Sequence, residues 1–128
     1  MDTKPIRILL IEDDPDYAQI IETLLTVMWD GKMILEHLDH LSAGLERLAK
    51  VDVDLILLDL SLPDSQGLST FTKIRRQAPH IPIIVLSGLP GQSVARRAIR
   101  EGAKAYLIKG RAEGPMLIRA VNHALEPR

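Results

Sequence analysis

The chain has 128 residues, enough to bury one hydrophobic core and too few for two ordinary domains. Its 46% hydrophobic and 26% charged residues match globular averages and exclude a disordered tail or a fibre, and its net charge of −1 gives no basic nucleic-acid footprint. The chain has no cysteine, no apolar run of membrane-spanning length and no start typical of a signal peptide, so we expect a cytoplasmic protein without disulfides or a membrane span.

The first half of the chain alternates short apolar runs with helical patterns. A nearly continuous apolar run at 6–11 predicts a strand that is buried on both faces. Pro15 suits a first helical turn, and the apolar residues behind it recur at helical spacing as far as Met28. A weaker strand pattern at 33–38 and a helical pattern at 42–50 follow.

The second half continues the alternation. Apolar runs at 53–58 and 81–86 predict two buried strands, and 105–108 predicts a fifth strand. A loop is expected at 88–91. The remaining helices are expected around 68–74, 94–99 and 116–125.

Five strands therefore alternate with five helices along residues 1–128. Because the strands are apolar on both faces, they predict a parallel sheet that is covered by helices on both sides. Crossover helices are right-handed, and at this length the natural arrangement is an α/β, doubly wound five-stranded sheet of flavodoxin-like topology. We find no repeat or linker, so we expect one domain without an effector domain.

Polar side chains follow four of the predicted strands. Glu12 and Asp13 follow the first strand, Asp59 the third, Ser87 the fourth and Lys109 the fifth. Ligands of an open parallel sheet bind at the carboxyl ends of its strands, so these side chains are expected to share one site. Clustered carboxylates need a compensating cation, and oxygen ligands without cysteine favour Mg²⁺. Together with a hydroxyl and a lysine they suit phosphoryl transfer, with an aspartate as nucleophile.

Four motifs make the sequence similar to a known family. They read ILLIEDDP at 8–15, DLILLDLSLPDSQGL at 54–68, PIIVLSG at 82–88 and GAKAYLIKG at 102–110. Each ends a predicted buried strand, and in this order they resemble a bacterial response-regulator receiver domain from about Ile6 to Leu125. The resemblance implies a phospho-accepting receiver of a two-component phosphorelay.

The resemblance assigns roles to the residues at the strand ends. Asp59 matches the aspartate that accepts the phosphoryl group. Glu12 and Asp13 match the acidic pair that holds Mg²⁺, with Asp13 as the more direct ligand. The main-chain carbonyl of Ser61 is expected as a third protein ligand of the metal. The implied phosphodonor is a phosphohistidine on a sensor histidine kinase or a phosphotransfer protein.

The resemblance also implies a conformational switch. Ser87 matches the hydroxyl residue that turns toward the phosphoryl group, and Lys109 matches the lysine that pairs with it. Tyr106 matches the aromatic residue that then moves inward. Gly110 departs from the family, in which proline often follows the lysine with a cis peptide bond, so the geometry of this loop stays open. Asp14 is a third acid to which the resemblance gives no role.

Each of these residues has a plainer interpretation when it is taken alone. Asp13 or Asp14 would cap a helix that begins at Pro15. Tyr106 would be a core residue and Asp59 a turn residue. A charged residue directly after so apolar a strand is costly unless it is used, however, and every position falls at a predicted strand end. The combination therefore favours the functional interpretation.

The last predicted helix has a wide apolar arc that includes Ile118 and Leu125. We expect the surface of the fourth helix, the fifth strand and the fifth helix to bind a downstream protein partner, an effector domain, or a second copy in a homodimer. The arginines of the third and fourth helices are interpreted as a solvated face, so we expect no direct nucleic-acid contact.

Three other functions compete with a phosphorylation-dependent switch, which is not a conventional enzyme because its output is a conformation. A haloacid-dehalogenase-like phosphatase would also use Asp59 and Mg²⁺, but it needs a second acid where Ser61 stands. A flavodoxin-like cofactor binder needs a phosphate-cradling loop after the first strand, where three acids stand. A receiver that only docks proteins is disfavoured by the intact set of Asp13, Asp59, Ser87 and Lys109.

Overall fold

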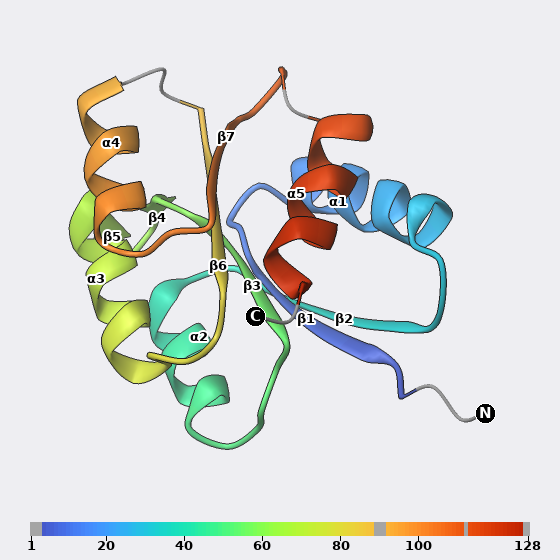
Figure 1. The fold of residues 1–128 in the computed structure, drawn as a ribbon. Coiled ribbons are helices and arrows are strands. Elements are labelled where there is room, and N and C mark those ends of the chain that lie inside the picture. Colours follow the sequence, from blue (N-terminus) through green and yellow to red (C-terminus); the bar gives the residue numbers. More distant parts are fainter. Residues whose placement is uncertain (1–3, 89–91, 112, 127–128) are drawn as a thin grey trace.

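The structure, a computed structural model, describes residues 4–88, 92–111 and 113–126. The strands of its main sheet are β1 (Ile6–Ile11), β2 (Met33–Leu38), β3 (Leu55–Asp59), β6 (Ile83–Ser87) and β7 (Ala105–Ile108). The helices are α1 (Pro15–Met28), α2 (Leu41–Leu48), α3 (Leu68–Gln77), α4 (Gln92–Arg100) and α5 (Pro115–Leu125). The five strands are parallel in the order β2-β1-β3-β6-β7. Helices α1 and α5 cover one face of the sheet, and α2, α3 and α4 cover the other (Figure 1), which confirms the predicted doubly wound fold.

The ends of the two central strands differ from the hydropathy pattern. Strands β3 and β6 each begin two residues later and end one residue later than their apolar runs predict. Pairing with the neighbouring strand decides this, because the ladder between β1 and β3 starts where Ile8 meets Leu55. Asp59 and Ser87 are consequently the last residues of their strands. Beyond Gly88, the loop predicted at 88–91 lies outside the described residues.

A short hairpin follows β3 that the sequence pattern did not predict. Its strands, β4 (Ser61–Leu62) and β5 (Ser65–Gln66), pair in antiparallel fashion around a Pro63-Asp64 turn. The Asp64 carboxylate accepts the main-chain N–H groups of Leu41 and Ser42 at 2.8 and 2.9 Å. The hairpin thereby caps α2, which begins one residue earlier than predicted.

Two hydrophobic cores lie on the two faces of the sheet. Side chains alternate along each strand, so Ile8 and Leu10 pack beneath α1 and α5 while Leu9 and Ile11 face the other helices. Phe71 of α3 is the largest fully buried side chain, and it fills the core under α2, α3 and α4. The central strands are buried on both faces, as their continuous apolar runs predict.

The wide apolar arc of α5 is explained by packing within the domain. Leu117 and Val121 are buried against the sheet, and Ile118 and Leu125 pack against the same core. Met116 is the exception, with 53% of its surface exposed. A homodimer through this face stays a prediction. Within the described part of the chain, no helix combines the length and the apolar character needed to cross a bilayer.

Candidate functional site

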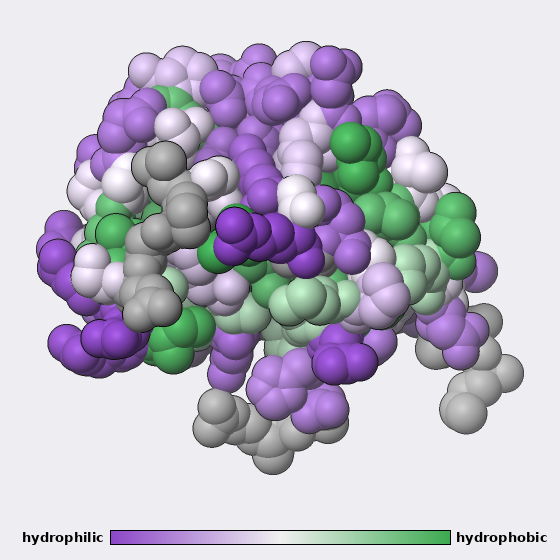
Figure 2. Space-filling model, turned by 90° about the horizontal axis from the view of Figure 1, so that it is seen from above, coloured by the Kyte–Doolittle hydropathy of each residue, from purple (hydrophilic) through white to green (hydrophobic). Residues whose placement is uncertain are grey.

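The carboxyl ends of four strands bring the predicted site residues to one edge of the sheet. Asp59 and Ser87 end β3 and β6, Glu12 follows β1, and Lys109 follows β7. These strands pair directly, β1 with β3, β3 with β6 and β6 with β7. Viewed from this edge, much of the surface is hydrophilic (Figure 2).

Two buried carboxylates share one lysine at the centre of this edge. Glu12 and Asp59 are 0% and 2% exposed. The Nζ atom of Lys109 lies 2.6 Å from Oε1 of Glu12 and 3.1 Å from Oδ2 of Asp59. The Lys109 contact with Asp59 is a hydrogen bond, whereas Oε1 of Glu12 is held by charge alone and has no aligned donor. One cation therefore offsets two carboxylates.

Burial and the contacts between these side chains shift the pKa values of Glu12 and Lys109. Burial raises the pKa of Glu12 from 4.5 to about 7, against the lowering effects of Lys109 and of the Asp14 N–H group, which donates to its other oxygen at 3.0 Å. Burial alone would lower the pKa of Lys109, but its contacts with Glu12 and Asp59 outweigh burial and raise that pKa. Lys109 stays charged, and its single positive charge cannot neutralise the carboxylates of both Glu12 and Asp59.

The acidic residues also fit a metal ion. Glu12, Asp13 and Asp59 each offer a carboxylate oxygen, and these three oxygens lie within 4.8 Å of one another. Asp13 is exposed, while the other two carboxylates are buried. A hard divalent cation such as Mg²⁺ takes oxygen ligands of this kind, and it would neutralise the charge that Lys109 leaves uncompensated. The donor set therefore fits the predicted ion.

A cavity of about 540 Å³ opens beside Asp59. It lies between the strand ends, the β4–β5 hairpin and the first part of α4, so a small anionic group can reach the carboxylate. Its lining combines acids, hydroxyls and the lysine with apolar side chains. The lining residues are Asp13, Asp14, Asp59, Leu60, Ser61, Gln66, Gly67, Ser87, Gly88, Val94, Tyr106 and Lys109.

Ser61 lies beside Asp59 in the hairpin. Its main-chain N–H donates to Oδ1 of Asp59 at 3.0 Å, and its hydroxyl donates to Oε1 of Gln66 at 2.9 Å. The N–H of Gly67 donates to the carbonyl of Leu60 at 2.7 Å and closes the loop. These bonds hold the segment after Asp59 in one conformation. The role of the Ser61 carbonyl as a metal ligand stays a prediction.

Ser87 and Tyr106 border the same cavity from neighbouring strands. Ser87 is buried, and its carbonyl accepts the N–H of Lys109 at 2.8 Å, which ties the end of β6 to the lysine. Tyr106 is half-buried, packs against the core under α4, and also lines the cavity. The plainer interpretation of Tyr106 as a core residue and its position beside the site are thus both observed.

Asp14 and Gly110, which the motif comparison left open, have structural explanations. Oδ1 of Asp14 accepts the N–H groups of Asp16 and Tyr17 at 3.0 and 3.3 Å, so Asp14 rather than Asp13 caps α1. Gly110 has φ +86°, a region that favours glycine, and the described residues contain no cis peptide bond.

Sequence reasoning missed two residues at this edge. Tyr17 places its ring centroid 4.7 Å from Nζ of Lys109 and donates its hydroxyl to Oε2 of Glu113 at 2.8 Å. The same Glu113 oxygen accepts the N–H of Gly110 at 3.0 Å. Tyr17 lies in the first turn of α1, just after the acidic residues that follow β1, and this position could have indicated it. Nothing in the sequence pattern indicated Glu113.

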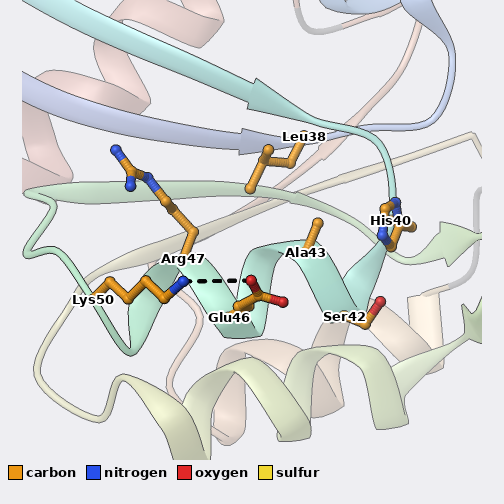
Figure 3. Close-up of a pocket in the computed structure, with 7 residues that line it drawn as sticks. All are labelled: Leu38, His40, Ser42, Ala43, Glu46, Arg47 and Lys50. Atoms are coloured by element: carbon orange, nitrogen blue, oxygen red, sulfur yellow. Dashed lines mark ion pairs between the residues drawn. The ribbon is translucent and has the colours of Figure 1, made fainter.

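A second cavity, of about 290 Å³, lies along α2 away from the acidic cluster (Figure 3). Several of its charged side chains are paired: Arg47 donates to Glu36 at 2.8 Å, and Lys50 lies 3.5 Å from Glu46. Its lining residues are Leu38, His40, Ser42, Ala43, Glu46, Arg47 and Lys50. None of the candidate site residues lines this cavity.

Comparison with known proteins identifies the class. The sequence model of the response regulator receiver domain matches residues 8–121. The chain belongs to this family, which acts in two-component signalling. The resemblance seen in the four motifs is thereby confirmed.

Curated relatives place the chain within that family. It is 32% identical over 110 residues to the glycerol metabolism activator of Pseudomonas putida, covering 86% of this chain and 50% of the relative. It is 33% identical over 104 residues to the transcriptional regulatory protein MalR of Bacillus subtilis, covering 81% and 44%. The chain spans about half the length of the curated relatives it matches.

Solved structures agree with the fold. The signal receiver domain of an HD domain-containing protein from Pseudomonas fluorescens matches with a TM-score of 0.84 and 28% identity, covering 98% of this chain and 90% of that one. A CheY-like receiver domain from Methanospirillum hungatei matches with a TM-score of 0.83 and 23% identity, covering 95% and 94%. The second likeness supports the fold alone.

Proposed function

We propose that this receiver domain accepts a phosphoryl group on Asp59 from a phosphohistidine donor and that acceptance switches its partner-binding surface. One observation carries the proposal. Asp59 is a nearly fully buried carboxylate that opens on a cavity and is contacted by a lysine whose charge it shares with a second buried acid. Such an edge is suited to receiving a small anionic group together with a cation.

Transfer exchanges one bond for another. A carboxylate oxygen of Asp59 attacks phosphorus, the phosphorus–nitrogen bond of phosphohistidine breaks, and the imidazole leaves with the electron pair and takes up a proton. Lys109 turns from its two carboxylates to the incoming phosphoryl oxygens. Glu12, Asp13, Asp59 and the carbonyl of Ser61 would hold Mg²⁺, which supplies positive charge next to those oxygens.

The output is a change of conformation. Ser87 would turn its hydroxyl toward the phosphoryl group, and Tyr106, which borders the same cavity, would follow into the vacated space. This biases a two-state equilibrium of the surface formed by α4, β7 and α5. We propose that this surface binds a downstream protein or an effector domain, with a homodimer as one form. We expect the domain to make no direct contact with nucleic acid or a membrane and to act in the cytoplasm.

Two alternatives are less well supported. A receiver that only docks proteins would not need the cluster of Glu12, Asp13 and Asp59 around a shared lysine. A metal-dependent phosphatase needs a second acid near the nucleophile, and the position two residues after Asp59 holds Ser61, whose hydroxyl is bonded to Gln66. We therefore propose self-phosphorylation and self-dephosphorylation chemistry in a switch rather than a conventional enzyme.

The test is the intact mass of the protein after incubation with acetyl phosphate and Mg²⁺. We expect wild type to gain about 80 Da, the mass of one phosphoryl group in an aspartyl-phosphate, and Asp59→Asn to gain none. Asp52→Asn, which alters an exposed acid that precedes β3, is the matched control and should be phosphorylated. No adduct on wild type, with Mg²⁺ binding measured separately, would favour the docking-only receiver.

A further inference from the structure

A chain of contacts leads from α1 to the segment that carries Lys109. The ammonium of Lys109 lies over the ring of Tyr17, the Tyr17 hydroxyl donates to Glu113, and Glu113 accepts the N–H of Gly110. Gly110 directly follows the lysine, so the contacts start and end on adjacent residues. None of the roles proposed above uses Tyr17 or Glu113.

The Tyr17 ring restricts the lysine from one side. At 4.7 Å from the ring centroid, Nζ of Lys109 is within the range of a cation–π interaction. Tyr17 and Lys109 are both partly buried, which strengthens such a contact relative to an exposed one. The two carboxylates and the ring thus contact the ammonium together.

Glu113 restricts the main chain of the lysine segment. One of its oxygens accepts both the Tyr17 hydroxyl at 2.8 Å and the Gly110 N–H at 3.0 Å. Gly110 has φ +86° and no side chain of its own to hold this conformation. Proline at this position would fix its own φ and would have no N–H to donate. Here the hydrogen bond from Gly110 takes over that restraint.

The Tyr17 hydroxyl keeps its proton in this arrangement. Burial raises the pKa of Tyr17 well above its usual value, and Glu113, Glu12 and Asp59 raise it further. The hydroxyl is therefore a hydrogen-bond donor across the physiological pH range.

We propose that Tyr17 and Glu113 are positioning residues that act as a pair on Lys109, holding its ammonium and the following segment ready for the phosphoryl group. The inference rests on the proposed phosphoryl transfer to Asp59. A lysine that is free to move must be ordered during transfer, so losing either contact slows phosphoryl acceptance while the acceptor and the acidic cluster stay intact.

The test compares Tyr17→Phe, Glu113→Gln and the double variant with wild type. Tyr17→Phe keeps the ring and its packing but removes the hydroxyl, and Glu113→Gln keeps the shape but removes the charge. Glu22→Gln, at an exposed acid further along α1, is the matched control for lost negative charge. Initial phosphorylation rates are measured against acetyl phosphate concentration at saturating Mg²⁺, and urea unfolding checks the fold.

We expect each single variant to lower the rate at saturating acetyl phosphate about fivefold, because Tyr17→Phe removes a hydrogen bond and Glu113→Gln replaces a charged acceptor with a weaker neutral one. The double variant should phosphorylate no more slowly than the slower of the two single variants, because the two residues act through one contact. Tyr17→Leu should be slower than Tyr17→Phe because it also removes the ring, and Glu22→Gln should match wild type.

Single-variant rates within twofold of wild type would overturn the proposal, and so would losses that multiply in the double variant. The NMR resonances of the Gly110 amide and the Lys109 ammonium report on the contacts with Glu113 and Tyr17 whether or not phosphoryl transfer takes place. If wild type took up no phosphoryl group, the proposed function would fail. The pairing would then be supported if both resonances shift in Tyr17→Phe and Glu113→Gln, and overturned if either resonance stays unchanged.

Discussion

The middle of the sheet and its carboxyl edge are built on opposite principles. In the middle, β1, β3 and β6 bury apolar side chains such as Leu9, Leu57 and Ile84 completely, without a polar group among them. At the edge, the same strands lead into Glu12, Asp59 and Ser87, which are buried and polar. Burial stabilises the first region and strains the second, since two carboxylates share one lysine there. The domain therefore gains stability from the first region, and we propose that its chemistry takes place in the second.

The largest expected effect is the loss of stability when the apolar core is disrupted. Phe71→Ala removes the largest fully buried side chain, so we expect the free energy of unfolding to fall by about 3–5 kcal/mol. Urea unfolding measures this. Phe71→Leu is the matched control and should lose clearly less, because it leaves a smaller void. A loss below about 1 kcal/mol for Phe71→Ala would contradict the assignment of this core as the source of stability.

The second prediction concerns the strain at the edge. Because the pKa of Glu12 is about 7 in the folded protein and 4.5 for an unperturbed glutamate, the folded state binds the proton more tightly. The contribution of Glu12 to the free energy of unfolding is then highest below pH 4.5, and it is lost as the pH rises through 7. At about 1.4 kcal/mol for each pKa unit, the fall is of the order of 3 kcal/mol.

Urea unfolding between pH 5 and pH 8, with no added divalent metal, measures that fall. Other groups titrate as well, so the relevant quantity is the difference between wild type and Glu12→Gln, in which the fall should be absent. Equal pH dependence in the two proteins would show that Glu12 is not the strained group.

Mg²⁺ should relieve the same strain. At a tenfold excess over its dissociation constant we expect Mg²⁺ to raise the free energy of unfolding by about 1.4 kcal/mol, more at pH 8 than at pH 5, since protonated acids bind metal poorly. Asp13→Asn should reduce this gain, while Asp16→Asn, at an acid outside the cluster, should keep it. A gain that survives Asp13→Asn and Glu12→Gln together would locate the ion elsewhere.

The smallest expected effect separates two neighbouring acids. Asp14→Ala removes the cap of α1 and should lower the free energy of unfolding by about 1 kcal/mol. Phosphorylation by acetyl phosphate should be nearly unchanged, because Asp14 lies outside the acidic cluster. Asp13→Ala should show the reverse, with little loss of stability and slow phosphorylation. Identical behaviour of the two variants would contradict the division of roles between these acids.

Local pattern was sufficient for much of the fold. The bounds of β1, α1, β2 and β7 agree with the hydropathy pattern, because each element has clear ends in the sequence, such as Pro15 at the start of α1. The β4–β5 hairpin was missed, since two-residue strands have no periodicity to detect. The starts of β3 and β6 were wrong because pairing with a neighbouring strand, rather than hydropathy, decides where a strand begins.

The sequence by itself determined which residues meet at the carboxyl edge. Parallel strands end on the same side, so Glu12, Asp59, Ser87 and Lys109 had to converge whatever the details of packing. Only the tertiary structure decided how they interact: that one lysine is shared by two buried acids, and that Glu113 ties Gly110 to Tyr17. Those contacts join loops and helices far apart in the chain, and their distances depend on how the helices pack on the sheet, which no local pattern of residues encodes.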